Sequence, residues 1–147
     1  MQTRMSNRAM SAAYWTTTIL TALAFLTAGA AYLARGDVQA QGIAVLGYPA
    51  YVLTILGTWK VRGGLAILAP RLPLLKEWAY AGFFFDLTGA AASRAFVGDG
   101  PVDIAAPLAF LALVVASWAL RPASRKLDAA KGEPATARMS AHEIRAA

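Results

Sequence analysis

Two long stretches without any charged side chain, residues 9–34 and 38–59, constrain this chain more than any other feature. A helix rises about 1.5 Å per residue, so about 20 apolar residues cross the roughly 30 Å hydrocarbon core of a bilayer. Apolar residues make up 58% of the chain and charged residues 15%, whereas an ordinary soluble domain has roughly 45–50% and about 25%. The 147 residues therefore predict one membrane domain rather than a soluble one.

Four segments have the length and the apolar character of a membrane-spanning helix. They cover about residues 12–34, 48–69, 75–96 and 104–120. The first could instead be a signal peptide, but it is longer than the roughly 7–15 residues of a signal core and it leads into further apolar segments. We therefore predict an all-α, polytopic membrane protein, built as a bundle of four transmembrane helices.

The positions of Lys and Arg outside these segments or at their ends predict the orientation, because basic loops stay in the cytoplasm. One side holds Arg35 and Arg94, and the other side holds ten basic residues. The ten are Arg4, Arg8, Arg71, Lys76, Arg121, Arg125, Lys126, Lys131, Arg138 and Arg145. Both termini are therefore expected in the cytoplasm.

In this arrangement residues 12–120 form the membrane domain, residues 1–11 a cytoplasmic tail, and residues 121–147 a basic, Ala-rich tail that is expected to be mobile or surface-lying. The net charge of +6 follows from this topology and from attraction to anionic lipid. Nucleic-acid binding is not expected, because the basic residues are split among termini and loops and lack a base-stacking aromatic surface.

The chain has no cysteine, and its single histidine, His142, lies in the polar tail. Without thiolates there is no disulfide framework, zinc–thiolate site or CxxC redox centre. One histidine in a tail cannot supply bis-histidine haem ligation between helices. No metal site and no catalytic residue are predicted, and the chain is not expected to act as an enzyme by itself.

Ionisable residues inside the predicted spans carry most of the functional information, because a charge near the bilayer centre costs about 2.5–3.5 kcal/mol on insertion scales. Lys60 lies ten residues before Pro70, and Asp86 lies eleven after Leu75. Both distances correspond to about 15 Å along a helix axis, so both side chains are expected near mid-membrane. We therefore predict a buried contact between Lys60 and Asp86.

Helical spacing predicts what surrounds these two residues. On the third span a small and polar stripe is formed by Trp78, Gly82, Asp86, Gly89 and Ser93. Another helix could come close to this stripe, and the Gly82 and Gly89 spacing is expected to allow such packing. On the second span Lys60 shares its stripe with Gly64, and Gly57 lies beside it.

Two interpretations of the polar interior stay open at this point. Such residues often act only as packing contacts worth about 0.6 kcal/mol on average, or they could form a site for a quinone, a proton or a small polar ligand. Structural roles are also expected for Pro49 in the first turn of the second span and for Glu77 at the positive end of the third. Aromatic residues near the span ends are expected to be interfacial anchors or to line a ring-binding pocket.

Three strings carry a resemblance to a known family: GYP at 47–49, GTWKVRGGLAIL at 57–68 and KEWAYAGFFFDLTGAAAS at 76–93. The chain resembles the DoxX-like family of small four-helix bacterial membrane proteins over roughly residues 14–120. The shared pattern is a lysine in the second span and a Lys-Glu-Trp opening of the third, followed by an acidic residue, a Gly-Ala pair and a serine. Many relatives are expected to have histidine after that serine, whereas this chain has Arg94.

The resemblance implies a multi-pass protein of the bacterial inner membrane. Members named for DoxD and DoxX look like small subunits or helpers of membrane oxidoreductase systems, some of them quinone-linked. It therefore implies an accessory or quinone-proximal subunit of a membrane redox or stress-response system, with an oxidoreductase partner and a quinone as ligand. A small proton-coupled transporter and a structural or assembly protein without ligand remain as alternatives. The candidate binding residues are Lys60, Asp86, Ser93, Trp78, Gly82 and Gly89.

Overall fold

The fold was obtained as a computed structural model, which describes residues 2–122 and 125–126. Within these residues the chain is all-helical and has no strand, so the predicted all-α class is confirmed. Its elements are α1 (Gln2–Leu33), α2 (Asp37–Val45), α3 (Tyr51–Leu68), α4 (Pro73–Phe96) and α5 (Pro101–Ala119). The predicted tail at 121–147 lies outside the described residues, except for its first two residues and 125–126.

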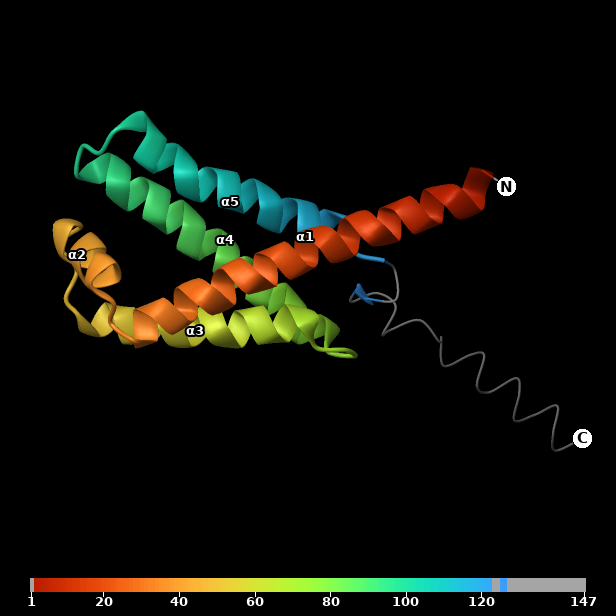
Figure 1. Cartoon of the computed structure of the whole chain (residues 1–147), viewed down its shortest axis with the longest axis horizontal. Helices are drawn as coiled ribbons and strands as arrows, with labels where there is room; N and C mark the ends of the chain where they lie inside the picture. Colours follow the sequence, from red (N-terminus) through yellow and green to blue (C-terminus); the bar gives the residue numbers. More distant parts are fainter. Residues whose placement is uncertain (1, 123–124, 127–147) are drawn as a thin grey trace, which may run out of the picture.

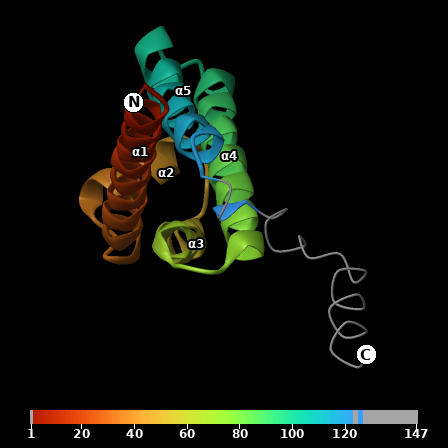
Figure 2. The same cartoon turned by 90° about the vertical axis from the view of Figure 1, so that its right-hand side faces the viewer.

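The four long helices form a closed ring in which α1 packs against α3, α3 against α4, α4 against α5 and α5 against α1. Neighbours in the ring are antiparallel (Figures 1 and 2). The α3–α4 connection and the last residues of α5 lie at one end of the bundle, which we call the basic end because it carries Arg71, Lys76, Arg121 and Arg125. The opposite end holds α2 and the α4–α5 connection, and we call it the α2 end (Figure 1).

Each of the four predicted segments is helical, but two features differ from the prediction. Helix α1 begins at Gln2, so most of the predicted N-terminal tail at 1–11 continues the first helix. Helix α2 was not predicted at all, because its nine residues are too few to cross a bilayer and the search was for bilayer-length segments.

Two sharp turns, one before α2 and one after it, set the bounds of this short helix. Arg35 has a positive φ of 52°, and the Gly36 N–H donates to the carbonyl of Ala31, five residues back. The same pattern follows α2, where Gly47 has φ 77° and the Tyr48 N–H donates to the carbonyl of Ile43. Both are Schellman-type helix ends, which satisfy the last carbonyl groups. The chain therefore turns sharply twice between α1 and α3.

The core of the bundle is apolar. It consists of Ala22, Phe25, Ile67, Tyr80, Phe83, Leu87 and Val114. The rings of Phe25 on α1 and Phe83 on α4 stack with centroids 3.6 Å apart and an interplanar angle of 19°. This contact joins two helices that lie diagonally across the ring, so the centre of the bundle is filled by aromatic side chains.

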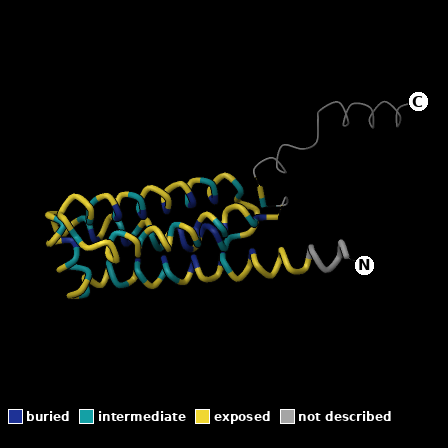
Figure 3. Tube along the Cα trace, turned by 90° about the horizontal axis from the view of Figure 1, so that it is seen from above, coloured by how far each residue is buried: buried dark blue, intermediate teal, exposed yellow. Residues whose placement is uncertain are grey.

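The outward faces of the long helices are largely exposed (Figure 3) and carry many large apolar side chains. Large exposed side chains include Ile19, Leu20, Leu23, Ile55, Leu65, Phe84, Phe85, Leu108, Phe110, Val115 and Trp118. A soluble monomer rarely exposes apolar surface on this scale. Among the described residues, two helices are long and apolar enough to cross a membrane, namely Arg8–Leu33 of α1 and Pro101–Ala119 of α5. The ionisable residues of the interior lie on the other two, α3 and α4.

Candidate functional site

The ammonium group of Lys60 on α3 donates a hydrogen bond to Oδ2 of Asp86 on α4. Only 11% of the Lys60 side chain and 16% of the Asp86 side chain are exposed. The structure therefore contains the contact that the axial depths of the two residues predict. Pairing spares each helix an isolated charge in an apolar environment, where an unpaired charge is costly.

Aromatic rings complete the surroundings of the Lys60 ammonium. Its Nζ atom lies 5.2 Å from the ring centroid of Phe25 and 5.3 Å from that of Tyr32, both on α1. A cation within about 6 Å of an aromatic face is attracted by the ring quadrupole. The ammonium is thus held between a carboxylate on α4 and two rings on α1.

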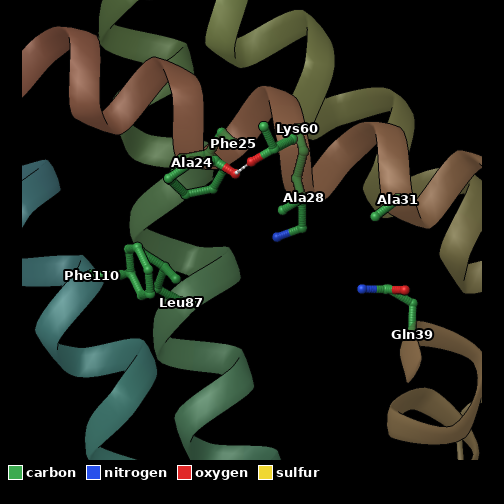
Figure 4. Close-up of a pocket in the computed structure, with 9 residues that line it drawn as sticks. Ala24, Phe25, Ala28, Ala31, Gln39, Lys60, Leu87 and Phe110 are labelled. Atoms are coloured by element: carbon green, nitrogen blue, oxygen red, sulfur yellow. Dashed lines mark hydrogen bonds between the residues drawn. The ribbon is translucent and has the colours of Figure 1, made fainter. Parts of the chain in front are cut away.

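A cavity of about 430 Å³ opens beside this ion pair. It is lined by Ala24, Phe25, Thr27, Ala28, Ala31, Gln39, Lys60, Leu87 and Phe110. In Figure 4 the Lys60 ammonium and the Gln39 amide extend into the same space, and Leu87 and Phe110 stand on the other side of it. The walls are therefore mostly apolar, with Lys60 from α3 and Gln39 from α2 converging on the space and Thr27 on α1, whose hydroxyl bonds to carbonyl groups of its own helix.

This combination is typical of a site for a small, largely apolar molecule. Ligand pockets commonly have volumes of about 300–1,000 Å³, apolar walls and a few placed polar groups. The ammonium of Lys60 offers hydrogen-bond donors, and the amide of Gln39 offers both a donor and an acceptor. A ligand with a flat apolar body and carbonyl oxygens would match both kinds of surface.

Three predicted interior residues lie instead on the outside of α4. Trp78 is 72% exposed, and Gly82 and Gly89 are exposed with no atom within 4 Å of a Cβ built on either. The prediction that these residues border the interior is therefore wrong within this chain. The buried face consists of Lys76, Tyr80, Phe83, Leu87 and Ala91. Burial of large aromatic and aliphatic side chains decided the rotation of α4, and Asp86 lies at the edge of that face.

The glycines of α3 behave as predicted, because they border the interior on the side of α1. Gly57 and Gly64 are both buried. A Cβ at Gly64 would lie 2.9 Å from Cγ of Leu26, and one at Gly57 would lie 2.9 Å from Cγ of Leu33. Neither position has room for a larger side chain, so these glycines set the distance between α1 and α3.

Ser93 and Pro49 lie at the α2 end and do not line the cavity. The hydroxyls of Ser93 and Tyr48 are 2.9 Å apart and share a hydrogen bond. Pro49 precedes α3, and its carbonyl accepts from the Val52 N–H. Arg94, at the position where a histidine was expected in relatives, donates from Nη1 to Oδ2 of Asp99 at 2.8 Å. These contacts hold connections between helices in place.

Glu77 lies in the second turn of α4 rather than at the helix start, since α4 begins at Pro73. Its Oε1 accepts from Nη1 of Arg121 at 2.7 Å, and its Oε2 accepts from Nε1 of Trp118 at 3.0 Å. The structural role predicted for Glu77 at a helix dipole is therefore replaced by a link from α4 to the end of α5.

A layer of hydroxyl groups on α1, α4 and α5, here called the hydroxyl layer, was not predicted from the sequence. The Ser117 hydroxyl on α5 lies 2.8 Å from the Thr18 hydroxyl on α1 and 2.8 Å from the Tyr80 hydroxyl on α4. Gln39 and Phe110 of the cavity, and Tyr32 beside the Lys60 ammonium, were not predicted as site residues either. Single hydroxyls and amides within apolar runs were the available signal, but only the packing of helices shows which of them meet. Within the described residues, no three acidic or imidazole side chains come together as metal ligands.

Comparisons with known proteins agree with the family resemblance of the three sequence strings described above. A family model described as the DoxX-like family matches residues 16–117, which is most of the chain. Neither curated proteins nor solved structures give a match.

Proposed function

The chain belongs to the DoxX-like family, and from this membership, its two apolar helices and its apolar exterior we propose a four-span protein of a bacterial inner membrane. In this arrangement α1, α3, α4 and α5 each cross the bilayer. The basic end faces the cytoplasm, because Lys and Arg concentrate there. The α2 end, with Asp37, Asp99 and Asp103, faces the outside.

We further propose that the cavity beside Lys60 binds a quinone, and that the protein is an accessory subunit of a membrane oxidoreductase. The observation that carries this proposal is the convergence of Lys60 and Gln39 on a mostly apolar cavity of about 430 Å³. A bound quinone would carry the electrons itself. The residues of this chain would bind and orient it.

The ion pair gives Lys60 a defined role in such a site. Because Asp86 accepts one of its hydrogen bonds, the ammonium is held in one position and keeps further donors for a ligand oxygen. Phe25 and Tyr32 on one side of the ammonium exclude water and strengthen any hydrogen bond made there. Gln39 would fix the other end of the ligand from α2.

The test is the thermal stability of the full chain in nanodiscs with and without a short-chain benzoquinone. We expect the quinone to raise the melting temperature in a concentration-dependent way, because a ligand that binds only the folded state stabilises it. Ala28→Phe, which places a ring in the cavity, should abolish the shift. The matched control is Ala30→Phe on the exposed side of the same helix, which should retain it.

A second variant separates binding from folding. Lys60→Met with Asp86→Leu removes the donor and its partner together, so no buried charge is left alone. This double variant should fold but should lose most of the quinone shift. If the wild type shows no shift, or if Ala28→Phe keeps it, the quinone proposal is wrong. Proton uptake into liposomes that depends on Asp86 would then favour the transporter alternative.

A further inference from the structure

The basic end of the bundle contains more buried positive charge than its described residues neutralise. Lys76 is 2% exposed and Arg121 is 5% exposed. Glu77 is the carboxylate that the structure places in contact with this group, and both of its oxygens are already bonded, one to Arg121 and one to Trp118. Among the cations of this group, Glu77 therefore contacts Arg121 alone, and the positive charge of the group exceeds its negative charge.

Lys76 is the most unusual member of the group. Its ammonium is buried, and among the described residues no atom accepts a hydrogen bond from it. Arg125 and Arg121 lie near enough to repel this ammonium. A buried ammonium without a partner is strongly unfavourable. The observation therefore points to a missing anion rather than to a packing role.

Arg125 is the third cation of the group, and, like Lys76, it has no acidic partner among the described residues. Its Nη1 donates to the neutral hydroxyl of Tyr14 at 3.2 Å. Its guanidinium lies over the ring of Trp15, 4.6 Å from the centroid. These contacts hold residues 125–126 over the basic end, where α1 and α4 supply Tyr14 and Lys76. Two arginines on the chain after α5 and one lysine on α4 thus surround the same end.

We propose that Lys76, Arg121 and Arg125 form a binding site for a phosphate-type oxyanion at the basic end. A tetrahedral anion with several acceptor oxygens can take hydrogen bonds from an ammonium and from guanidinium groups at once. Basic pockets between helices on the cytoplasmic side commonly receive lipid phosphates. The phosphate of an anionic phospholipid and free inorganic phosphate share this chemistry, and the experiment distinguishes them.

The site stands apart from the quinone proposal. Lys76, Arg121 and Arg125 do not line the cavity beside Lys60. Loss of quinone binding would leave the anion site unaffected, and loss of anion binding would leave the quinone shift in place. The two proposals can therefore fail separately.

The experiment measures thermal unfolding of the delipidated full chain in neutral detergent. The three probes are phosphatidylglycerol, phosphatidylcholine and inorganic phosphate. We expect phosphatidylglycerol to raise the melting temperature more than phosphatidylcholine. A matching shift with inorganic phosphate alone would identify the free anion as a sufficient ligand, and its absence would identify the lipid headgroup.

Lys76→Met tests the residue that carries the argument. It should weaken the apparent affinity for the effective probe about tenfold, the effect of losing one charge-assisted hydrogen bond. Without any probe it should melt at or above the wild type, because an unpaired buried charge is gone. The matched control is Lys126→Gln, which removes the same charge from an exposed side chain and should leave the affinity unchanged.

Three outcomes would overturn the proposal. The first is that no probe stabilises the wild type. The second is that Lys76→Met and Lys126→Gln respond to the probes identically. The third is that stabilisation appears only after Asp128→Asn, Glu133→Gln and Glu143→Gln are combined, since an acidic side chain of the C-terminal tail would then be the native partner of Lys76.

Discussion

Gly29 on α1 and Gly57 on α3 face each other so closely that a Cβ atom built on either would lie 3.0 Å from the carbonyl oxygen of the other. The contact is therefore between two backbones, which cannot move aside as a flexible side chain can. It holds α1 against α3 directly beside Lys60, whose own Cβ lies 3.0 Å from the built Cβ of Gly29. The position of the ion pair thus depends on two residues that have no side chain.

Replacing Gly57 with alanine should destabilise the fold by about 1–3 kcal/mol, the usual cost of overpacking. The added methyl group would meet the backbone of α1 and the side chains of Leu33 and Tyr32. The measurement is the free energy of unfolding in a denaturing-detergent titration. Gly82→Ala is the matched control, because nothing lies within 4 Å of it and alanine favours the helix by up to about 1 kcal/mol. Equal destabilisation by both variants would contradict the close approach of α1 and α3.

Reversing one charge of the central ion pair should cost more stability than reversing both. Lys60→Asp places two carboxylates together, and Asp86→Lys places two ammonium groups together, so each should cost about 3 kcal/mol or more. The double variant restores an opposite-charge pair and should recover part of that loss. Unfolding free energies of the four proteins give the coupling energy. A double variant whose loss equals the sum of the two single losses would mean that Lys60 and Asp86 do not interact directly.

The hydroxyl layer near the basic end should behave as a coupled unit. Ser117→Ala removes the group that both Thr18 and Tyr80 contact at 2.8 Å, and it should destabilise by about 1–2 kcal/mol because buried hydroxyls lose a partner. Tyr80→Phe should cost less in the Ser117→Ala background than in the wild type. Thr58→Ala is the control, since its hydroxyl bonds only the Thr54 carbonyl of its own helix. Additive effects of Ser117→Ala and Tyr80→Phe would show that the two hydroxyls act independently.

The proposed topology can be tested without background labelling, because the chain has no cysteine. Val97→Cys lies at the α2 end and Leu72→Cys lies in the α3–α4 connection, and both side chains are exposed. A membrane-impermeant maleimide should label the first in intact spheroplasts and the second only after the membrane is permeabilised. The reverse pattern would invert the orientation, and labelling of both in intact spheroplasts would contradict the four-span arrangement.

The sequence by itself determined the four long helices and the central ion pair. Runs of apolar residues at bilayer length can satisfy their backbone only as helices, which sets the class and the approximate bounds of α1, α3, α4 and α5. The depth of Lys60 and Asp86 along their helices follows from the constant rise per residue. Because two isolated charges at the same depth are unfavourable in an apolar interior, their pairing was predictable.

Tertiary structure alone decided how each helix is rotated and what the ion pair borders. The helical spacing of small and polar residues on α4 predicted that Trp78, Gly82 and Gly89 face the interior. In the structure they face outward, because Phe83 packs against Phe25 and Tyr80 packs against α5. The cavity and the hydroxyl layer are each formed by residues that lie far apart in the chain and come from three or more helices. Helical periodicity describes one helix at a time. The rotation of a helix about its axis depends on how much apolar surface it buries against all of its neighbours, so this rotation is fixed only in the assembled bundle.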